Sequence, residues 1–589
     1  MQKGDSELIG NGALPIGMLA IARGAVFTAP DITENDLQAF DFSGSHRFSD
    51  TLAFSGNVFR RENDTDSFNG DASEFALCNF AGGAQALFDE DDALEDRLED
   101  DLDIELDDIC DGEEDAVRNF SDLEELIEEA AEAAGLDDDE YEPEDLTEDL
   151  SGSGLLSDEA INNISRREQV SSGFGGQFVL TEDVFARSNQ FIVGYSWFRG
   201  KSSFDAVTEL AGLNPVTRST RGLGTGTFFD EAATDIRTET ETRSIYFSNT
   251  LDLTAELALT LSGRYNDTDV TLRDRSGERP ELNGDHAFSR FNPAVGLTWN
   301  PHTDFTVYGS YSEANRVPTP IELACNEGVF ELAQQYAEAD GEDPDDIEFE
   351  CRLPNAFLAD PPLDDVVTRS VELGMRMTFS DIRYTLGLFS ATNDDDIIFQ
   401  TTGRATGLFA NVDQTHRWGF EMGLSGMLGA LDWYASYSFV QATFEDDFMV
   451  LSPHHPNANA NGELAVQAGD RMPGIPEHML KLGGDFHVLE NATLGMEVFF
   501  NSNQVLRGDE ANRLDKIDGF ALVNLRGSYR VTDGLTLFTR VTNVFDKEYE
   551  NFGLLGEDPT EILPLADARP LFLGVGAPRA AWLGASLRF

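Results

Sequence analysis

The stretch 579–589, which ends the chain, alternates between apolar and other side chains. One set is Ala581, Leu583, Ala585, Leu587 and Phe589, and the other is Trp582, Gly584, Ser586 and Arg588. A period of two places these sets on opposite faces of a β-strand. In water the apolar face would be an aggregation hazard. The pattern therefore favours a strand that faces lipid on one side and a polar lumen on the other.

The same alternation recurs from residue 35 onward, with charged side chains on the polar face of many segments. Soluble sandwiches alternate too, so one such strand is weak evidence and many long ones are much stronger. The pattern predicts an all-β fold, a transmembrane antiparallel β-barrel with about seventeen strands in this chain. They lie near 35–47, 51–62, 167–180, 188–200, 236–250, 256–272, 287–299, 304–313, 366–379, 381–398, 405–427, 430–445, 476–488, 492–506, 516–531, 534–546 and 577–589.

The predicted connections alternate between short and long. The short ones lie near 49–50, 182–183, 254–255, 301–302, 380–381, 428–429, 490–491 and 533–534. Most of the others are long loops, near 63–166, 201–235, 273–286, 314–365, 446–475 and 547–576. Short periplasmic turns and long extracellular loops are typical of outer-membrane barrels, whereas a soluble sandwich has no reason to keep this parity.

This parity places residues 1–34 outside the membrane, as the remnant of an extracellular loop, and Phe589 on the periplasmic side. The barrel would then cover residues 35–589, with 63–166 as a long acidic loop insertion. Single-chain bacterial barrels have even strand numbers, so an odd count that begins after an outer loop predicts an odd number of strands upstream of Met1. Residues 11–27 do not resemble an export signal, which also favours a missing N-terminus.

The chain has 589 residues and a formal net charge of −69, from 109 acidic and 40 basic residues. Several soluble domains or one large barrel fit this length. The charge argues against nucleic-acid binding, which needs clustered lysine and arginine. It favours a solvated exterior, cation-rich surroundings or a salty habitat. No run of about 18 apolar residues occurs, which excludes transmembrane helices but not spanning strands of about 9–11 residues.

The four cysteines fall into two pairs, Cys78 with Cys110 and Cys325 with Cys351. Each pair lies within one polar, loop-like region. The spacing therefore predicts two loop-closing disulfides in an oxidising compartment. Zinc is the alternative, and it is weak because no CxxC motif or nearby histidine pair accompanies these cysteines.

The loop 63–166 contains a strongly acidic tract over 88–150. Within it, Ser121 and Glu124 have the spacing of a capping box, and a glycine at 135 is a stop signal. We therefore predict a short acidic helix over 122–134, and a second over 328–339 in the other cysteine-bounded loop. The rest of the tract fits a solvated, partly disordered loop, with cation capture as the functional alternative. No segment matches a calcium-binding loop, so no ion site is predicted there.

Several motifs resemble those of TonB-dependent outer-membrane receptors. The stretch 541–549 (VTNVFDKEY) is similar to the family's N-L-F-D-K-x-Y element, and 576–579 (GAPR), before the last strand, is similar to its G-x-P-R element. Residues 291–299 and 308–320 resemble a mid-barrel pattern, and 469–478 resembles the entry to a late strand. The residues that carry the C-terminal likeness, which is fairly specific, are Asn543, Phe545, Asp546, Tyr549, Pro578, Arg579 and Phe589.

The resemblance covers residues 35–589 and implies the C-terminal part of a 22-stranded barrel that carries an N-terminal plug. It implies a bacterial outer-membrane location. The implied partners are membrane lipid, a small-molecule or glycan ligand, and the TonB energy-transducing complex. Neither the plug nor the TonB-contacting box is visible in this chain. About seventeen strands would leave about five upstream, an odd number as the parity requires.

Few residues are candidates for chemistry. The Ser, His and Asp residues are scattered and no nucleophile elbow occurs, so no enzyme is predicted, and no cofactor either. His454 and His455 lie in a predicted outer loop and are weak metal candidates, because neighbours on an extended chain point apart. Six basic residues should face the lumen and balance carboxylates or contact a plug: Arg376, Arg383, Lys481, Arg526, Arg530 and Arg588.

Three functions fit these features. The leading hypothesis is a receptor barrel for energised uptake of a scarce nutrient, which the resemblance implies is a metal chelate, a vitamin or an oligosaccharide. The second is a passive outer-membrane pore, and the third is a surface binding protein that acts through its acidic loops. A plug upstream would favour the first over the second, and deletion of about 84–150 would test the third.

Overall fold

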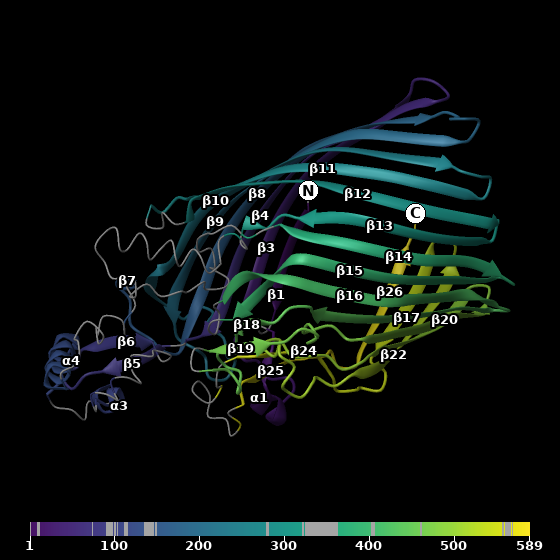
Figure 1. The fold of residues 1–589 in the computed structure, drawn as a ribbon. Helices are drawn as coiled ribbons and strands as arrows, with labels where there is room; N and C mark the ends of the chain where they lie inside the picture. The colour runs from purple at the N-terminus through teal and green to yellow at the C-terminus, as the bar shows by residue number, and fades with distance from the viewer. Residues whose placement is uncertain are drawn as a thin grey trace.

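One long antiparallel sheet dominates the fold and curves into a barrel wall (Figure 1). The computed structural model describes residues 2–8, 12–73, 75–89, 98, 102, 104–110, 116–134, 147, 150–277, 282–320, 323, 363, 365–401, 407–459, 462–556, 559, 567 and 569–588. Over these residues the sheet contains 19 strands. In the same part of the chain, no helix is both long enough and apolar enough to cross a membrane.

The wall is an up-and-down meander in which each strand pairs antiparallel with the next one along the wall. All seventeen predicted segments coincide with a strand. The strands are β3 Asp31–Arg47, β4 Leu52–Ala72, β8 Ala160–Thr181, β9 Asn189–Ala211, β10 Gly224–Asp252, β11 Leu257–Asp274, β12 Gly284–His302, β13 Phe305–Arg316, β14 Val366–Phe379, β15 Ile382–Thr401, β16 Gly407–Leu428, β17 Leu431–Phe444, β20 His478–Leu489, β21 Ala492–Asn501, β22 Phe520–Thr532, β23 Leu535–Thr542 and β26 Ala580–Leu587.

The N-terminal range 1–34 holds more structure than the loop that the sequence suggested. Strand β1 (Gln2–Leu8) pairs antiparallel with the first part of β3, from Gln2 opposite Leu37 to Leu8 opposite Asp31. A two-residue strand β2 (Leu14–Pro15) and a short helix α1 (Ile16–Ile21) follow. The sequence of β1, QKGDSEL, has no apolar file, so periodicity could not reveal it. That residues 1–34 lie outside the membrane stays a prediction.

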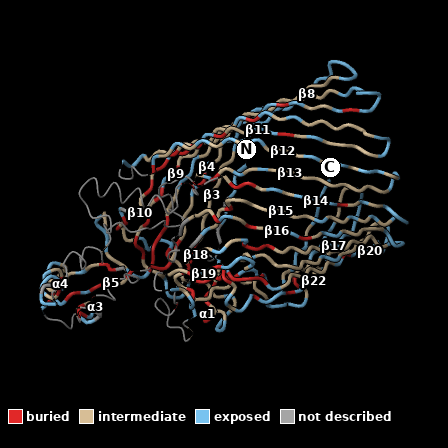
Figure 2. Tube along the Cα trace, in the orientation of Figure 1, coloured by how far each residue is buried: buried red, intermediate tan, exposed pale blue. Residues whose placement is uncertain are grey.

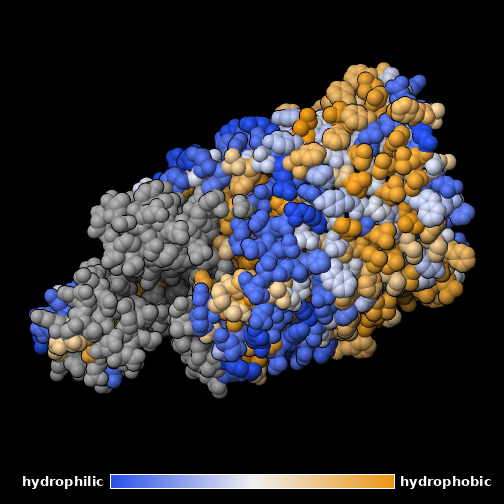
Figure 3. Space-filling view, viewed as in Figure 1, coloured by the Kyte–Doolittle hydropathy of each residue, from blue (hydrophilic) through white to orange (hydrophobic). Residues whose placement is uncertain are grey.

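The two faces of the wall differ as the alternation predicted. On β14, Val371 and Leu373 point outward and are both 53% exposed, while Glu372 between them points inward. Apolar surface gathers around the ends of β12–β17 that carry the short turns, and polar surface covers the part toward the long loops (Figure 3). The longest strands therefore extend well beyond the apolar band, because a spanning strand needs only about 9–11 residues.

Glycines on the inner face make room for tyrosine rings that lie flat on the neighbouring strand. A Cβ atom added at Gly483 on β20 would collide with the ring of Tyr434 on β17. Gly194 and Gly374 stand in the same relation to Tyr246 and Tyr308. These pairs therefore lock adjacent strands in register, since an inner-face side chain larger than hydrogen would displace the ring.

We expect Gly483→Ala to destabilise the wall by about 1–3 kcal/mol, because the tyrosine ring must leave its position. The matched control is Gly387→Ala on β15, which also faces inward but whose added Cβ would meet nothing within 4 Å. The measurement is the midpoint of urea unfolding of the detergent-solubilised protein, followed by tryptophan fluorescence. Equal midpoints for the two variants would contradict the proposed role of the ring.

A small module with its own core lies at the long-loop end of the wall (Figures 1 and 2). In the sequence it falls between strands β4 and β8. It contains β5 (Phe75–Asn79), β6 (Gln85–Asp89), α3 (Leu106–Cys110) and α4 (Phe120–Ala134). We call the described residues 75–134 the outer module. Two of its buried side chains, Phe75 and Leu87, pack against wall residues Ile161, Leu210 and Phe229. Its own core consists of Cys78, Phe80, Phe88, Leu98, Ile104, Leu106, Ile109, Val117, Leu123, Ile127 and Ala131. The described part of the acidic tract thus includes a packed structure.

The outer module confirms one predicted disulfide and one predicted helix. Cys78 and Cys110 are bonded, whereas Cys325 and Cys351 lie outside the described residues, as does the range 328–339. Helix α4 covers the predicted 122–134, but it begins earlier than the capping box implied. The side chain of Asn119, not that of Ser121, accepts the first-turn hydrogen bond, from the Asp122 N–H at 3.2 Å. Asparagine is as good an N-cap as serine.

Candidate functional site

Charged side chains on the inner face of β20, β21 and β22 form a network together with Tyr434 of β17. Lys481 Nζ lies 3.1 Å from Glu497 Oε2, which also accepts a 2.5 Å hydrogen bond from the Tyr434 hydroxyl. Arg526 donates two hydrogen bonds of 2.8 Å to the Asp485 carboxylate. The expectation that Lys481 and Arg526 balance lumen carboxylates is therefore confirmed. Such paired charges fix the wall rather than mark a substrate.

The other predicted lumen bases are placed differently. Arg376 lies over the ring of Tyr308, with its guanidinium carbon 5.2 Å from the ring centroid. Arg530 donates to the backbone carbonyl of Glu490 at 3.2 Å. Arg383 and Arg588 are exposed side chains. Of the six predicted bases, Lys481 and Arg526 therefore contact carboxylates. Arg376 contacts a tyrosine ring and Arg530 a backbone carbonyl.

Outer loops far apart in the sequence pack into one body, which we call the canopy. It comprises residues 445–477, 502–519 and 547–576 as far as they are described, together with 12–30. Hairpin β18–β19 (Phe448–Leu451 and Glu463–Val466) packs its Val450 and Leu464 against Phe444 and Ala511. Buried residues gather in this region and also in the long-loop ends of β8–β11 (Figure 2). These outer loops therefore have a hydrophobic core of their own.

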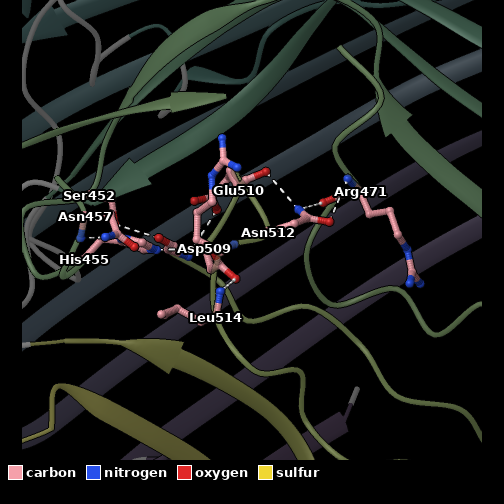
Figure 4. Close-up of polar contacts among 10 residues, drawn as sticks. Ser452, His455, Asn457, Arg471, Asp509, Glu510, Asn512 and Leu514 are labelled. Carbon is pink, nitrogen blue, oxygen red and sulfur yellow. Dashed lines mark hydrogen bonds and ion pairs between the residues drawn. The ribbon is translucent and has the colours of Figure 1, made fainter. Parts of the chain in front are cut away.

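His455 joins two of these loops. Its side chain is fully buried, and its Nε2 lies 3.2 Å from Asp509 Oδ1 (Figure 4). Its Nδ1 accepts the backbone N–H of Asn457 at 3.0 Å, so in the neutral ring Nε2 carries the proton and donates it to Asp509. Neighbouring His454 is half-buried. Among the described residues, no group of three or more His, Cys, Asp or Glu side chains could hold a metal ion.

Asp509 is the centre of this contact. Its carboxylate also accepts the backbone N–H groups of Arg513 at 2.7 Å and Leu514 at 3.0 Å. Around it, Ser452 Oγ donates to the carbonyl of Gly508 at 2.7 Å. Asn512 exchanges two hydrogen bonds with the backbone of Arg471, as Figure 4 shows. Every one of these links joins residues 445–477 to 502–519 or orders the latter internally.

Burial raises the pKa of the Glu510 carboxyl, with the charge of Asp509 adding to the effect. A pKa raised by folding means that the ionised form is disfavoured in the folded canopy. This penalty is absent below the ordinary carboxyl pKa and grows as the pH rises through the raised value. The canopy should therefore open less readily near pH 5 than near pH 8.

We expect Glu510→Gln to remove this pH dependence and to stabilise the canopy above the raised pKa. The amide oxygen can still accept the 3.1 Å hydrogen bond that Gly508 N–H donates to Glu510 Oε1. Hydrogen exchange of residues 505–517, corrected for intrinsic rates, measures the opening between pH 5 and pH 8. A variant that opens more readily than the native protein at pH 8 would show that the ionised carboxylate stabilises the loop.

The canopy also links the two ends of the chain. Strand β2 pairs with β25 (Leu571–Val575), which pairs in turn with β24 (Glu550–Leu555). Arg23 forms a 2.6 Å ion pair with Glu550. On the other side, the N–H of Thr220 donates to the carbonyl of Ala29 at 2.9 Å. Residues 12–30 thus connect the C-terminal outer loop with the connection between β9 and β10.

The family-motif residues build the outer end of β23 and its contact with the start of β26. Asn543 is buried, and its side chain donates to the carbonyls of Lys547 at 2.9 Å and Ala577 at 3.2 Å. Asp546 Oδ1 accepts the backbone N–H of Arg579 at 2.9 Å. Asn543 and Asp546 both have positive φ, which these residue types tolerate. The motif therefore joins the end of β23 to the start of β26. It does so through Asn and Asp side chains, which can hydrogen-bond to the backbone and tolerate the positive φ of a turn.

The remaining motif residues contribute less to this contact. The ring of Tyr549 packs against Phe520 with 4.4 Å between centroids. Phe545 is 76% exposed and Pro578 is exposed. Phe589 lies outside the described residues. Asp509, Glu510, Asn512 and Arg23 could not be found from the sequence, because their partners are brought near only by the fold.

Comparison with known proteins agrees with this architecture. A model of the family described as "TonB dependent receptor-like, beta-barrel" matches residues 22–544. The chain belongs to this family. TonB-dependent receptor barrels are bacterial outer-membrane proteins, so the predicted location is confirmed. The family and the structural neighbours are transport receptors.

Individual relatives are distant. The "Probable TonB-dependent receptor BfrD" of Bordetella pertussis is 22% identical over 268 residues, which are 44% of this chain and 30% of that protein. The ferric citrate transporter FecA is 14% identical, with a TM-score of 0.62 over 100% of this chain and 66% of that one. The copper transporter OprC is also 14% identical, with a TM-score of 0.58 over 100% and 68%. This receptor barrel thus spans under a third of that curated relative and about two thirds of these solved structures, and the structures support the fold alone.

Proposed function

We propose that this receptor barrel takes part in energised, TonB-dependent uptake of a scarce nutrient across the outer membrane. The observation that carries the proposal is the canopy. It packs loops from both ends of the chain, residues 12–30 and 547–576 among them, over the outer entrance of the barrel wall. Such loops can capture a ligand, and the polar inner face offers it a path. Structural neighbours are named for ferric citrate and for copper, so a metal chelate is the first class to test, before a vitamin or an oligosaccharide. We propose no catalytic activity.

Uptake in cells that carry the complete native gene tests this proposal. A strain with the gene deleted and then restored is given 55Fe-labelled ferric citrate, 64Cu(II), labelled cobalamin and a labelled maltooligosaccharide. We expect one of these probes to accumulate only when the gene is present and the TonB complex is intact. Accumulation that persists without TonB would identify a passive pore instead. Absence of gene-dependent accumulation for all four would overturn uptake of these classes.

A surface binding function is the second candidate, and the outer module favours it. This module has its own buried core and its own disulfide, which a simple connecting loop does not need. Deletion of residues 75–134, with a short glycine-serine linker in their place, separates the two functions. Lost binding of the probe to whole cells with uptake unchanged would favour the surface binding role. Loss of both would place the module within the uptake path.

A further inference from the structure

A groove lies on the outward face of the wall, near the outer ends of β3, β4, β8, β9 and β10. Its volume is about 670 Å³, which falls within the size range of small-molecule pockets. One wall is formed at a bulge of β10, where the register with β9 shifts between Phe229 and Thr234. The groove belongs neither to the inner face nor to the canopy, so the proposed uptake function does not account for it.

One row of its residues crosses five strands at directly opposed positions. Glu34 is opposite Asp66, which is opposite Arg166 on the next strand. Arg166 is opposite Asp205, which is opposite Asp235. The row therefore holds four carboxylates and one guanidinium. All five residues line the groove.

The charges in this row are not balanced within it. Like charges that face each other across strands are destabilising, and the row contains two such pairs, Glu34 with Asp66 and Asp205 with Asp235. Arg166 donates a 2.8 Å hydrogen bond to Glu168, outside the row, and lies 4.0 Å from Asp66. Arg237 and Arg275 offset part of the charge at Asp235, but Asp274 adds to it. A cation bound in the groove would relieve both like-charge pairs.

A second row consists of apolar side chains and lies two residues further out along β3, β4, β8 and β9. Ile32 is opposite Phe68, Phe68 is opposite Ile164, and Ile164 is opposite Val207. These four side chains are half-buried and line the same groove. The groove thus presents an apolar strip beside an acidic one. An inorganic cation would use only the acidic strip, whereas an organic cation can cover both.

The position of the groove indicates where its occupant comes from. On β4, Asp66 is eight residues beyond Val58, which faces outward within the apolar band. At about 3.3 Å per residue, this places the groove roughly 26 Å further along the strand, which for a strand tilt of about 35–45° is roughly 20 Å above that part of the band. Membrane hydrocarbon does not reach this height, so the occupant arrives from solution. No set of described acidic, His or Cys side chains has the grouping that a metal ion needs.

We propose that this groove binds an amphiphilic organic amine from solution, with its ammonium group on the acidic row and its hydrocarbon body on the apolar row. Glu34, Asp66, Asp205 and Asp235 supply the charge that is complementary to the ammonium group, and Ile32, Phe68, Ile164 and Val207 supply the apolar contact. Such a site is separate from uptake, because it faces away from the lumen.

The test uses dansylcadaverine, a primary amine with an aromatic body, added to the full chain in a non-ionic detergent. Its fluorescence should rise saturably beyond the change seen with empty micelles. Asp205→Asn combined with Asp235→Asn should weaken binding by about tenfold or more, since a charge-assisted contact is lost. The matched control is Asp267→Asn combined with Asp269→Asn. It removes the same charge from the same outward face, on β11 and outside the groove.

A third variant tests the apolar row. Ile164→Thr combined with Val207→Thr should weaken dansylcadaverine binding several-fold and leave the weak binding of putrescine, which lacks the aromatic body, unchanged. Retained heat-modifiable mobility on gels shows that each variant is folded. Equal weakening by both pairs of Asp→Asn changes would mean bulk attraction and overturn the site. Absence of saturable binding, or full displacement by low millimolar Mg²⁺, would overturn it as well.

Discussion

Replacing both Cys78 and Cys110 with alanine is expected to lower the local stability of the outer module by about 3–4 kcal/mol. The bond closes a loop with a sequence separation of 32, and the loss follows from the entropy that the open loop regains. The module lies outside the wall's ladder of hydrogen bonds, since its strands β5 and β6 form a separate two-stranded sheet, with one further bridge from Phe88 to Thr147. It therefore depends on its small core, on this bond and on the packing of Phe75 and Leu87 against Phe229 of the wall.

Limited proteolysis of intact cells or of detergent-solubilised protein measures this effect. A loss of 3–4 kcal/mol corresponds to about a few hundredfold faster cleavage within 75–134, if cleavage follows local opening. Reduction of the native protein with dithiothreitol should have the same effect without any substitution. Cys325→Ala combined with Cys351→Ala is the control, because those cysteines belong to a different loop. Unchanged protection of the module after reduction would show that its apolar core alone is sufficient.

The wall was predictable because each strand carries its own evidence. Lipid on one side and polar lumen on the other force the alternation seen in 371–379 and 479–488, and no tertiary knowledge is needed to find it. Strand β1 was missed for the same reason, since QKGDSEL has no apolar file and is recognisable only by its pairing with β3. Register could not be predicted either, because it depends on which residues of the neighbour lie opposite.

The canopy was much less predictable than the wall. The pair His454 and His455 was visible in the sequence as chemistry in an outer loop, but its interpretation as a weak metal candidate depended on exposure. The structure buries His455 against Asp509, which is 54 residues away. Arg23 and Glu550 are 527 residues apart. A single sequence has no signal for contacts of this kind, whereas Cys78 and Cys110 could be paired because their chemistry restricts their partners.

Replacing Asp509 with alanine should have the largest effect on the canopy. The change leaves three donors without their acceptor, His455 Nε2 and the backbone N–H groups of Arg513 and Leu514. Asp509 and His455 are 1% and 3% exposed, so water cannot replace the carboxylate without opening the structure. We expect a loss of about 3–5 kcal/mol in the local stability of residues 505–517.

Hydrogen exchange of the detergent-solubilised protein reports this loss as exchange that is faster by roughly 10² to several thousandfold at residues 505–517 and 450–466 together. Both segments should respond because Asp509 joins them through His455. Asp515→Ala is the matched control, since Asp515 is an exposed carboxylate in the same loop and its removal should leave exchange unchanged. Faster exchange confined to 505–517 would mean that the apolar contacts of Val450 and Leu464 hold the β18–β19 hairpin without the His455 contact. In that case the canopy would consist of separately moving loops, and capture by a jointly packed entrance would have to be abandoned.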